Sequence, residues 1–294
     1  LFALNPDNID SNTYDMHDKY GNYYYSFIYN VINQGDVRDS VLKAVGQFIS
    51  DPDMRQVYKD IQSKYRNEDI EEIGAELTGA FRYFKYHFPQ AEMPKYYTSY
   101  ISGFNFNVTT VDSTLGIGLD MYLGPESKYY QMLQWPRYKT RVMDRPYIVP
   151  DCMRGWIIHT FDKNEPINNL LNHMIFYGKM YYCLDAVLPD SPDSMKIGYS
   201  AKQMKYCNEN EKNLWAYFTT NDRLYKNDLK EVAEYTSEGP FTAAISKECP
   251  PRIAMWVGLQ IVRAYMDRNP DVTVAQLMSE SDAQKILTKS KYKP

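Results

Sequence analysis

The amino-acid sequence predicts a predominantly α-helical α+β fold with a small antiparallel sheet. In residues 13–88, and again from Tyr147 to the end of the chain, the residue pattern is typical of helices, with apolar side chains recurring at helical spacing. Residues 95–123 differ, because they form short runs rich in Tyr, Phe, Val, Thr and Ile. We therefore expect an N-terminal helical region at residues 1–92 and an α+β region at residues 93–294, packed as one compact unit.

Four helices are expected in the N-terminal region. Asp51 before Pro52 is typical of a helix start, because aspartate caps the first turn and proline fits the first helical position. In the fourth helix, Ile73, Leu77 and Phe84 recur at helical spacing. The four expected ranges are Thr13–Gln34, Asp36–Ile49, Pro52–Tyr65 and Glu68–Phe88.

Three strands are expected next, over Tyr96–Ile101, Phe104–Thr109 and Leu115–Leu123, with turn signals between them. The third strand alternates glycine with apolar residues at Gly116 and Gly118. Glycines in a strand allow another backbone or a ligand to come close. Tight packing against a helix explains them equally well, and the sequence leaves both interpretations open.

The remaining chain is expected to be helical to its end. Ser200 with Gln203, and Thr273 with Gln276, fit the capping-box pattern of a helix start. Two short helices are expected at the C-terminus. The longer expected helices are Pro150–Phe161, Ile167–Val187, Ala201–Thr220, Leu224–Tyr235 and Pro251–Arg268.

Charge and composition argue against two classes of protein. The chain has 33 basic and 37 acidic residues and no strongly basic block, so we expect no nucleic-acid partner. The longest apolar run, Ile253–Val262, is too short to cross a bilayer. The four cysteines form no CxxC pair, and we expect free buried thiols, with one or two disulfides left open.

The segment Leu170–Tyr182 is the most informative part of the sequence. It predicts a helix that is apolar on nearly every side, which is typical of a helix buried between two layers. It also carries His173, Tyr177 and Lys179 into that layer. An enzyme of this shape would keep its active site there.

The catalytic and binding motifs with fixed spacing are missing. No histidine begins a His-Glu-x-x-His motif, which a zinc protease of that type needs to place two imidazoles one helical turn apart. The sequence also lacks a Gly-x-Ser-x-Gly elbow, a phosphate-binding loop and a Gly-x-Gly-x-x-Gly fingerprint.

Several single residues still have two interpretations. His159 and His173 could share a metal with Cys152, Asp151 or Asp162, or be hydrogen-bonded core residues. Lys179 could be a base in a pocket, or an ordinary helix lysine. Arg154 and Arg252 could bind an anion, although pairing with a carboxylate is simpler. Asp120, a charge within an apolar strand, could belong to a site or cap a neighbouring helix.

Several segments, in order along the chain, resemble the gliding-motility lipoprotein GldB of Bacteroidota. The most specific ones lie beyond Leu115, and the start Leu4–Asp7 resembles the family's mature start after a lipidated cysteine. The resemblance implies a cell-envelope protein, lipid-anchored as the full-length precursor, with its soluble domain outside the cytoplasm. The segments that carry it are Ile117–Gly124, Tyr147–Arg154, Leu170–Tyr182, Leu184–Asp190, Asn210–Phe218, Pro251–Gly258 and Asp282–Leu287.

The resemblance also implies kinship with predicted zinc peptidases of zincin-like shape. Where those relatives carry a Glu-Gly pair, this chain has Tyr177-Gly178, and their His-Glu-x-x-His helix corresponds to Cys152–His159. Because tyrosine and arginine are poor zinc ligands, we expect a degenerate zincin-like domain without metal, cofactor or catalytic residue. The expected vestigial cleft consists of Asp120, Arg154, His159, His173, Tyr177 and Lys179.

The leading hypothesis is a non-enzymatic envelope lipoprotein that binds other envelope proteins or an extended peptide, the latter by strand addition beside the old cleft. One alternative is an active hydrolase or peptidase with a rearranged metal site. A second alternative is a purely structural envelope subunit.

Overall fold

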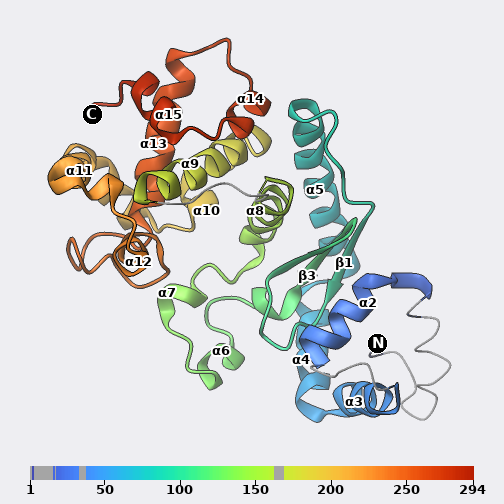
Figure 1. The fold of residues 1–294 in the computed structure, drawn as a ribbon. Helices are drawn as coiled ribbons and strands as arrows, with labels where there is room; N and C mark the ends of the chain where they lie inside the picture. The colour runs from blue at the N-terminus through green and yellow to red at the C-terminus, as the bar shows by residue number, and fades with distance from the viewer. Residues whose placement is uncertain (1, 3–15, 17, 33–37, 162–168) are drawn as a thin grey trace.

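The protein is described by a computed structural model, which covers residues 2, 16, 18–32, 38–161 and 169–294 (Figure 1). The predominantly helical α+β fold predicted from the sequence is confirmed. The N-terminal helices are α2 (Asn22–Phe27), a π-helical turn (Ile28–Ile32), α3 (Arg38–Ser50), α4 (Pro52–Lys64) and α5 (Asn67–His87).

The predicted start of α4 is confirmed in detail. The Asp51 carboxylate accepts hydrogen bonds from the backbone N–H groups of Asp53 and Met54, each at 2.9 Å, and Pro52 opens the helix. Within the described residues, the expected helix Thr13–Gln34 is helical at residues 16, 18–20 and 22–32, and it is interrupted at Gly21, which has a positive φ of 51°. Residues 13–15, 17, 33 and 34 of that prediction lie outside the described residues.

The sheet has three strands in the order β1-β3-β2: β1 (Tyr96–Tyr100), β2 (Val108–Val111) and β3 (Thr114–Gly118). The prediction of a purely antiparallel sheet is wrong. β2 pairs with β3 antiparallel, but β1 pairs with β3 in parallel, with Tyr96 opposite Thr114. Gly103 begins a loop and not a hairpin turn, so β2 does not pair with β1. Instead, β2 pairs with the side of β3 opposite to β1, and β1 is left at one edge of the sheet.

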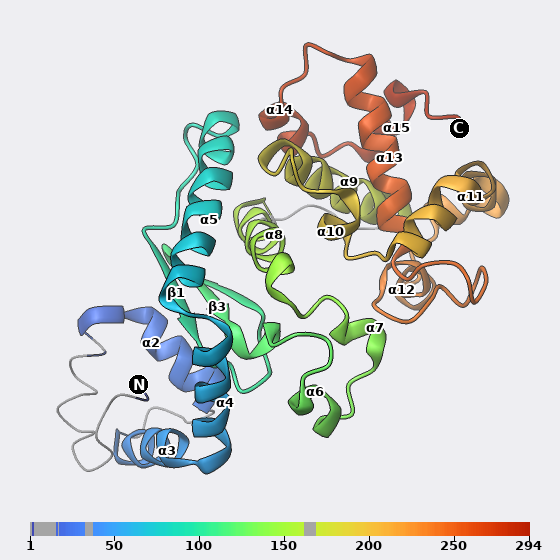
Figure 2. The same cartoon turned by 180° about the vertical axis from the view of Figure 1, so that it is seen from behind.

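The remaining helices form the C-terminal part of the molecule, which Figure 2 shows from behind. Four of the expected long helices agree closely with α8, α9, α11 and α13, and residues 167 and 168 of the expected Ile167–Val187 lie outside the described residues. The expected helix Leu224–Tyr235 is wrong in extent, because Asp228 caps a new helix. The helices are α6 (Lys128–Met132), α7 (Arg137–Thr140), α8 (Ile148–Phe161), α9 (Leu170–Val187), α10 (Asp193–Ile197), α11 (Ala201–Thr219), α12 (Leu229–Thr236), α13 (Ile253–Arg268), α14 (Val274–Ser279) and α15 (Ala283–Ser290), with 3₁₀ turns at Leu119–Tyr122, Arg145–Tyr147 and Thr220–Tyr225.

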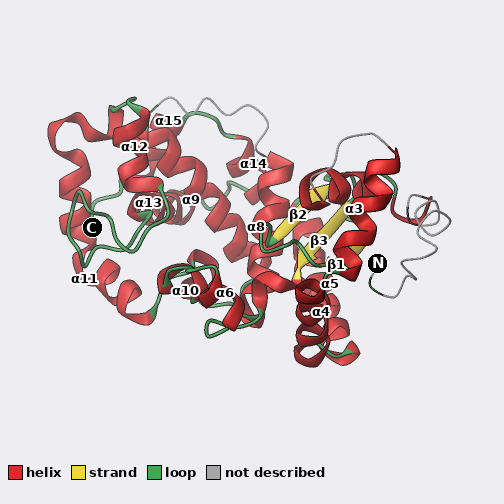
Figure 3. Cartoon of the chain, turned by 90° about the horizontal axis from the view of Figure 1, so that it is seen from below, coloured by secondary structure: helices red, strands yellow, loops and turns green. Residues whose placement is uncertain are grey.

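Both faces of the sheet are covered, as the view from below shows (Figure 3). The hydroxyl groups of Tyr23 in α2 and Thr109 in β2 form a hydrogen bond, with their oxygen atoms 3.2 Å apart. A Cβ on Gly116 would lie 1.8 Å from the Tyr23 hydroxyl, and a Cβ on Gly155 of α8 would lie 3.2 Å from Val108 of β2. Gly116 is therefore explained by tight packing against a helix, one of its two predicted interpretations.

Helix α9 is buried and central, as its sequence predicts, and its main partner is α13. A Cβ on Gly178 would lie 2.4 Å from the Gly258 carbonyl oxygen. A Cβ on Gly258 would lie 1.8 Å from the carbonyl oxygen of Met174. The two helices therefore cross with their backbones in contact, and only glycine fits at either position.

All four cysteines are buried and free, as expected. Within the part of the chain that the structure describes, no helix is both long and apolar enough to cross a membrane.

Candidate functional site

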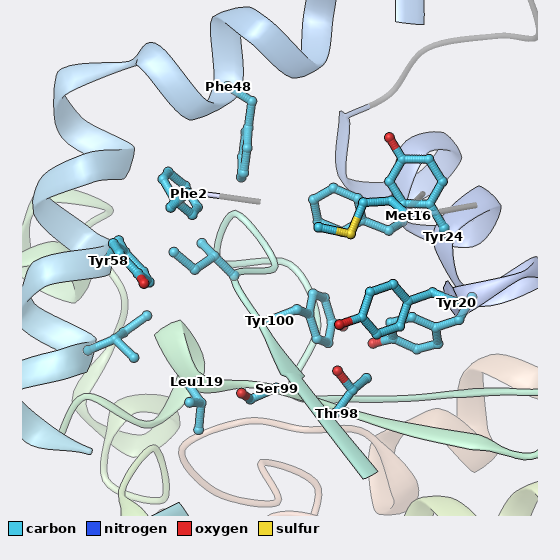
Figure 4. Close-up of a pocket in the computed structure, with 14 residues that line it drawn as sticks. Phe2, Met16, Tyr20, Tyr24, Phe48, Tyr58, Thr98, Ser99, Tyr100 and Leu119 are labelled. Carbon is cyan, nitrogen blue, oxygen red and sulfur yellow. The ribbon is translucent and has the colours of Figure 1, made fainter. Parts of the chain in front are cut away.

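A cavity of about 240 Å³ lies between the N-terminal helices and the sheet; we call it the β1 groove (Figure 4). Its walls come from α2, α3, α4 and β1, and its floor includes Leu119 after β3. None of the lining side chains is charged. They are Phe2, Met16, Tyr20, Tyr23, Tyr24, Phe27, Phe48, Tyr58, Ile61, Thr98, Ser99, Tyr100, Ile101 and Leu119.

The β1 groove runs along the free edge of strand β1. Successive side chains of a strand point to opposite faces, so a cavity that contacts the four consecutive residues 98–101 lies along the strand's edge. The opposite edge of β1 is occupied by β3. The groove therefore faces the peptide groups of β1 that do not pair within the sheet.

The free peptide groups of β1 can be assigned from the ladder. The N–H of Tyr96 donates to the Ser113 carbonyl at 3.3 Å, on the β3 side. Because alternate residues of a parallel strand point their N–H and C=O groups to the same side, those of Tyr97 and Ser99 point away from β3. Among the described residues, none forms a backbone hydrogen bond with these groups of Tyr97 and Ser99. Ser99 is also exposed, so a second chain can reach its N–H.

The walls of the groove are aromatic and neutral. Tyr23 and Phe27 of α2 each meet the Tyr100 ring edge-on, with ring centroids 6.0 and 6.3 Å apart. Phe2 stacks on Tyr58 of α4 at 5.0 Å. Burial raises the pKa of the Tyr23 hydroxyl to about 12, so the ring stays uncharged at physiological pH. Such walls favour apolar side chains over charged ones.

Asp120, a residue expected in the vestigial cleft, fixes a loop. Its buried carboxylate accepts hydrogen bonds from the Ser102 N–H (2.8 Å), the Ser102 hydroxyl (3.0 Å) and the Phe104 N–H (2.6 Å). Burial raises the pKa of Asp120, and these donors act in the opposite direction. The predicted strand Phe104–Thr109 is shifted to Val108–Val111, because residues 102–106 form this loop, and the predicted strand Leu115–Leu123 ends early, at Gly118.

Arg154 lies on α8 and pairs with a carboxylate, the simpler of its two predicted roles. Its guanidinium donates to Asp151 at 2.6 Å, and Asp151 also accepts from the Tyr122 hydroxyl at 2.9 Å. This pair lines a second cavity, and Lys179 is not among the residues that line it. The Lys179 ammonium donates to the Glu280 carbonyl, just beyond the end of α14, at 2.8 Å. Asp120, Arg154 and Lys179 thus each contact a different part of the fold.

The two histidines of the expected cleft differ in exposure. His159 is exposed near the end of α8, where its ring lies 5.5 Å from that of Trp156. His173 is half-buried in the first turns of α9, and Tyr177 one turn later contacts the Phe176 ring. Among the described residues, no three His, Cys, Asp or Glu side chains are grouped so as to hold a metal. Asp162, a possible third ligand, lies outside the described residues.

Protonation of His173 should make stability depend on pH. Burial lowers the pKa of His173 below its usual value of 6.5, and burial lowers the pKa of His87 as well. The unfolded chain therefore binds these protons more tightly, so the contribution of the two histidines to the free energy of unfolding is fully present above about pH 6.5 and is lost as the pH falls below it. Urea unfolding should give a lower free energy at pH 5.5 than at pH 7.5, with a smaller difference in His173→Gln. If the difference in unfolding free energy between the two pH values were the same in both proteins, this role for His173 would be contradicted.

The sequence contains only a weak signal for the β1 groove. Tyrosine is abundant, with 28 residues against 12 phenylalanines, and this balance suits shallow, half-exposed grooves. A compositional habit of the organism explains the same number. Tyr24 and Ser99 line the same groove although they are 75 positions apart, and no periodicity within either segment predicts that they share it.

Comparison with known families gives one result. A family model described as "Gliding motility protein GldB" matches residues 1–294, the full chain. No curated protein and no solved structure matches the chain.

Proposed function

The chain belongs to the GldB family of gliding-motility-associated lipoproteins, and from that membership we propose that it is a non-enzymatic cell-envelope protein that holds an extended segment of a partner protein along strand β1. The soluble domain would lie outside the cytoplasm, with a lipid anchor on the precursor. The observation that carries this proposal is the free edge of β1 inside an uncharged, aromatic groove.

Strand addition explains the features of the groove together. An added strand would pair with the outward N–H and C=O groups of Tyr97 and Ser99. Its side chains would alternate, so that those on one face enter between the rings of α2 and α4. An open strand edge is a liability in a soluble protein unless something covers it, which supports a partner of this kind.

The proposal includes the loss of peptidase chemistry. In the alignment that the sequence resemblance implies, Tyr177 takes the place of a zinc-binding carboxylate. Gly178 is accounted for by the contact with Gly258 of α13. Lys179 is 1% exposed and donates to a backbone carbonyl. These contacts support a packing role for α9 in place of a catalytic one.

A pair of substitutions at Ser99 tests the proposal. Peptides selected from a random displayed library on the wild-type protein should bind Ser99→Ala with unchanged affinity, because the backbone donor remains. Ser99→Pro removes that N–H at an edge position where the sheet tolerates proline. We expect it to weaken binding at least about tenfold, from one lost hydrogen bond and the steric bulk of the ring.

Two results would contradict the proposal. One is a failure to select any peptide that depends on the folded protein. The other is peptides that bind Ser99→Pro as well as wild type, since the β1 edge would then be irrelevant. Circular dichroism of both variants supplies the folding control. If no peptide binds, the purely structural alternative is favoured.

A further inference from the structure

A second cavity, of about 520 Å³, lies between α7, α8, α10 and the start of α13, and we call it the arginine cleft. Three arginines from three separate elements line it: Arg141 after α7, Arg154 on α8 and Arg252 immediately before α13. They are 111 positions apart at the extremes, so the fold alone gathers them. Like charges do not gather in a cavity without compensation.

The three guanidinium groups converge on one turn of backbone. Each donates to a successive carbonyl at the end of α10: Arg154 to Lys196 (3.4 Å), Arg252 to Ile197 (2.8 Å) and Arg141 to Gly198 (2.6 Å). Capping of a helix C-terminus accounts for part of this arrangement. Each guanidinium has five N–H donors, so the carbonyls leave several of them available.

Carboxylates compensate the three positive charges incompletely. Asp151 is already shared between Arg154 and the Tyr122 hydroxyl. Arg252 is ion-paired with Glu238 at 3.1 Å, but that glutamate is 69% exposed on the loop between α12 and α13. Arg141 makes no ion pair with any residue in the described parts of the chain. The cleft thus has one buried and one exposed carboxylate for three arginines.

The position of Arg252 indicates a built site. Its side chain is only 13% exposed, and it also donates to the Tyr181 hydroxyl at 3.2 Å. Its backbone has a φ of 56°, a left-handed conformation that costs energy for a residue with a Cβ. Such strain is found mainly where the surrounding structure requires it, often at a binding site. It precedes α13, whose N-terminal dipole favours negative charge at the same place.

We propose that the arginine cleft binds an oxyanion, a carboxylate or phosphate group, between Arg141 and Arg252. The ligand would displace the Glu238 carboxylate, which occupies part of the site as an internal substitute. Arginine is suited to this role because its planar fork matches the two oxygens of either group. The inference is independent of the β1 groove and would survive the failure of strand addition.

The experiment measures binding of sodium phosphate and, separately, sodium succinate to the full chain by titration calorimetry at constant ionic strength, with chloride as the reference. We expect saturable binding of at least one of the two. The better probe identifies which oxyanion the site prefers. Arg141→Gln should weaken binding at least about tenfold, consistent with the loss of a charged hydrogen bond. Glu238→Gln should strengthen it several-fold, because the competing carboxylate is gone.

Arg137→Gln is the matched control. Arg137 is an exposed arginine on α7, one turn before Arg141, and it does not line the cleft. Its loss should leave binding unchanged. The inference is overturned if neither anion binds saturably, or if Arg137→Gln weakens binding as much as Arg141→Gln. It is also overturned if Glu238→Gln, an exposed substitution that should not affect folding, fails to raise affinity.

Discussion

Replacing Gly258 with alanine is expected to destabilise the protein by about 3 kcal/mol or more, the upper range for overpacking. The new Cβ would lie 1.8 Å from the Met174 carbonyl oxygen and 2.9 Å from its Cα, so α9 and α13 would have to separate. Alanine's better helix propensity offsets only about 1 kcal/mol of this. Chemical denaturation monitored by circular dichroism measures the change.

The control is the same substitution at Gly79 in α5. A Cβ there meets nothing within 4 Å, and Gly79 has no positive φ. Gly79→Ala should therefore stabilise the protein, by up to about 1 kcal/mol, through helix propensity. If Gly258→Ala were as well tolerated as Gly79→Ala, the close crossing of α9 and α13 would be wrong. The explanation of Gly178 as a packing residue would then be wrong too.

Replacing Asp185 with alanine is expected to cost about 3 kcal/mol, as for removal of one member of a buried ion pair. Asp185 of α9 pairs with Lys196 of α10 at 2.8 Å and with Arg263 of α13 at 2.6 Å. The Lys196 side chain is 5% exposed, so its ammonium group would be left buried without a carboxylate. Arg263 would keep its second partner, Asp193, at 2.7 Å. Denaturant titration measures the loss.

A second substitution distinguishes the cost of leaving the buried Lys196 charge unpaired from the cost of lost packing. Lys196→Met in the Asp185→Ala background should recover much of the stability, because it removes the uncompensated ammonium. Glu209→Ala is the surface control: its pair with Lys205 is exposed at 3.7 Å, so its loss should cost less than about 0.5 kcal/mol. No recovery in the double variant would mean that the Asp185 effect does not arise from the buried charge of Lys196.

The helices were largely predictable because their signals are local. Each signal depends only on residues within one short segment, and the structure confirms each. These signals are the Asp51-Pro52 start, the two capping boxes and the two-sided apolar pattern of α9. The direction of β1 was not predictable in this way. Whether β1 has a parallel or an antiparallel partner depends on whether β3 or β2 lies next to it. The local residue pattern of β1 is compatible with either arrangement.

The roles of individual polar residues were the least predictable. Asp120 is an unusual charge in a segment whose pattern predicts an apolar strand, but its partners, Ser102 and Phe104, lie in a loop that the pattern predicts to be partly strand. Arg154 and Arg252 were noted separately, and their convergence with Arg141 on α10 follows only from the tertiary fold. The local sequence marks these residues as unusual, but only the tertiary fold determines which of them meet.

Amide hydrogen exchange at Ser99, with and without a selected peptide, tests strand addition most directly. In the free protein the Ser99 N–H points away from β3 and should exchange fast, whereas that of Thr98 lies on the paired side of β1. Binding along β1 should protect the Ser99 amide strongly and change Thr98 little. A peptide that binds while Ser99 exchanges at its free rate would contradict the account.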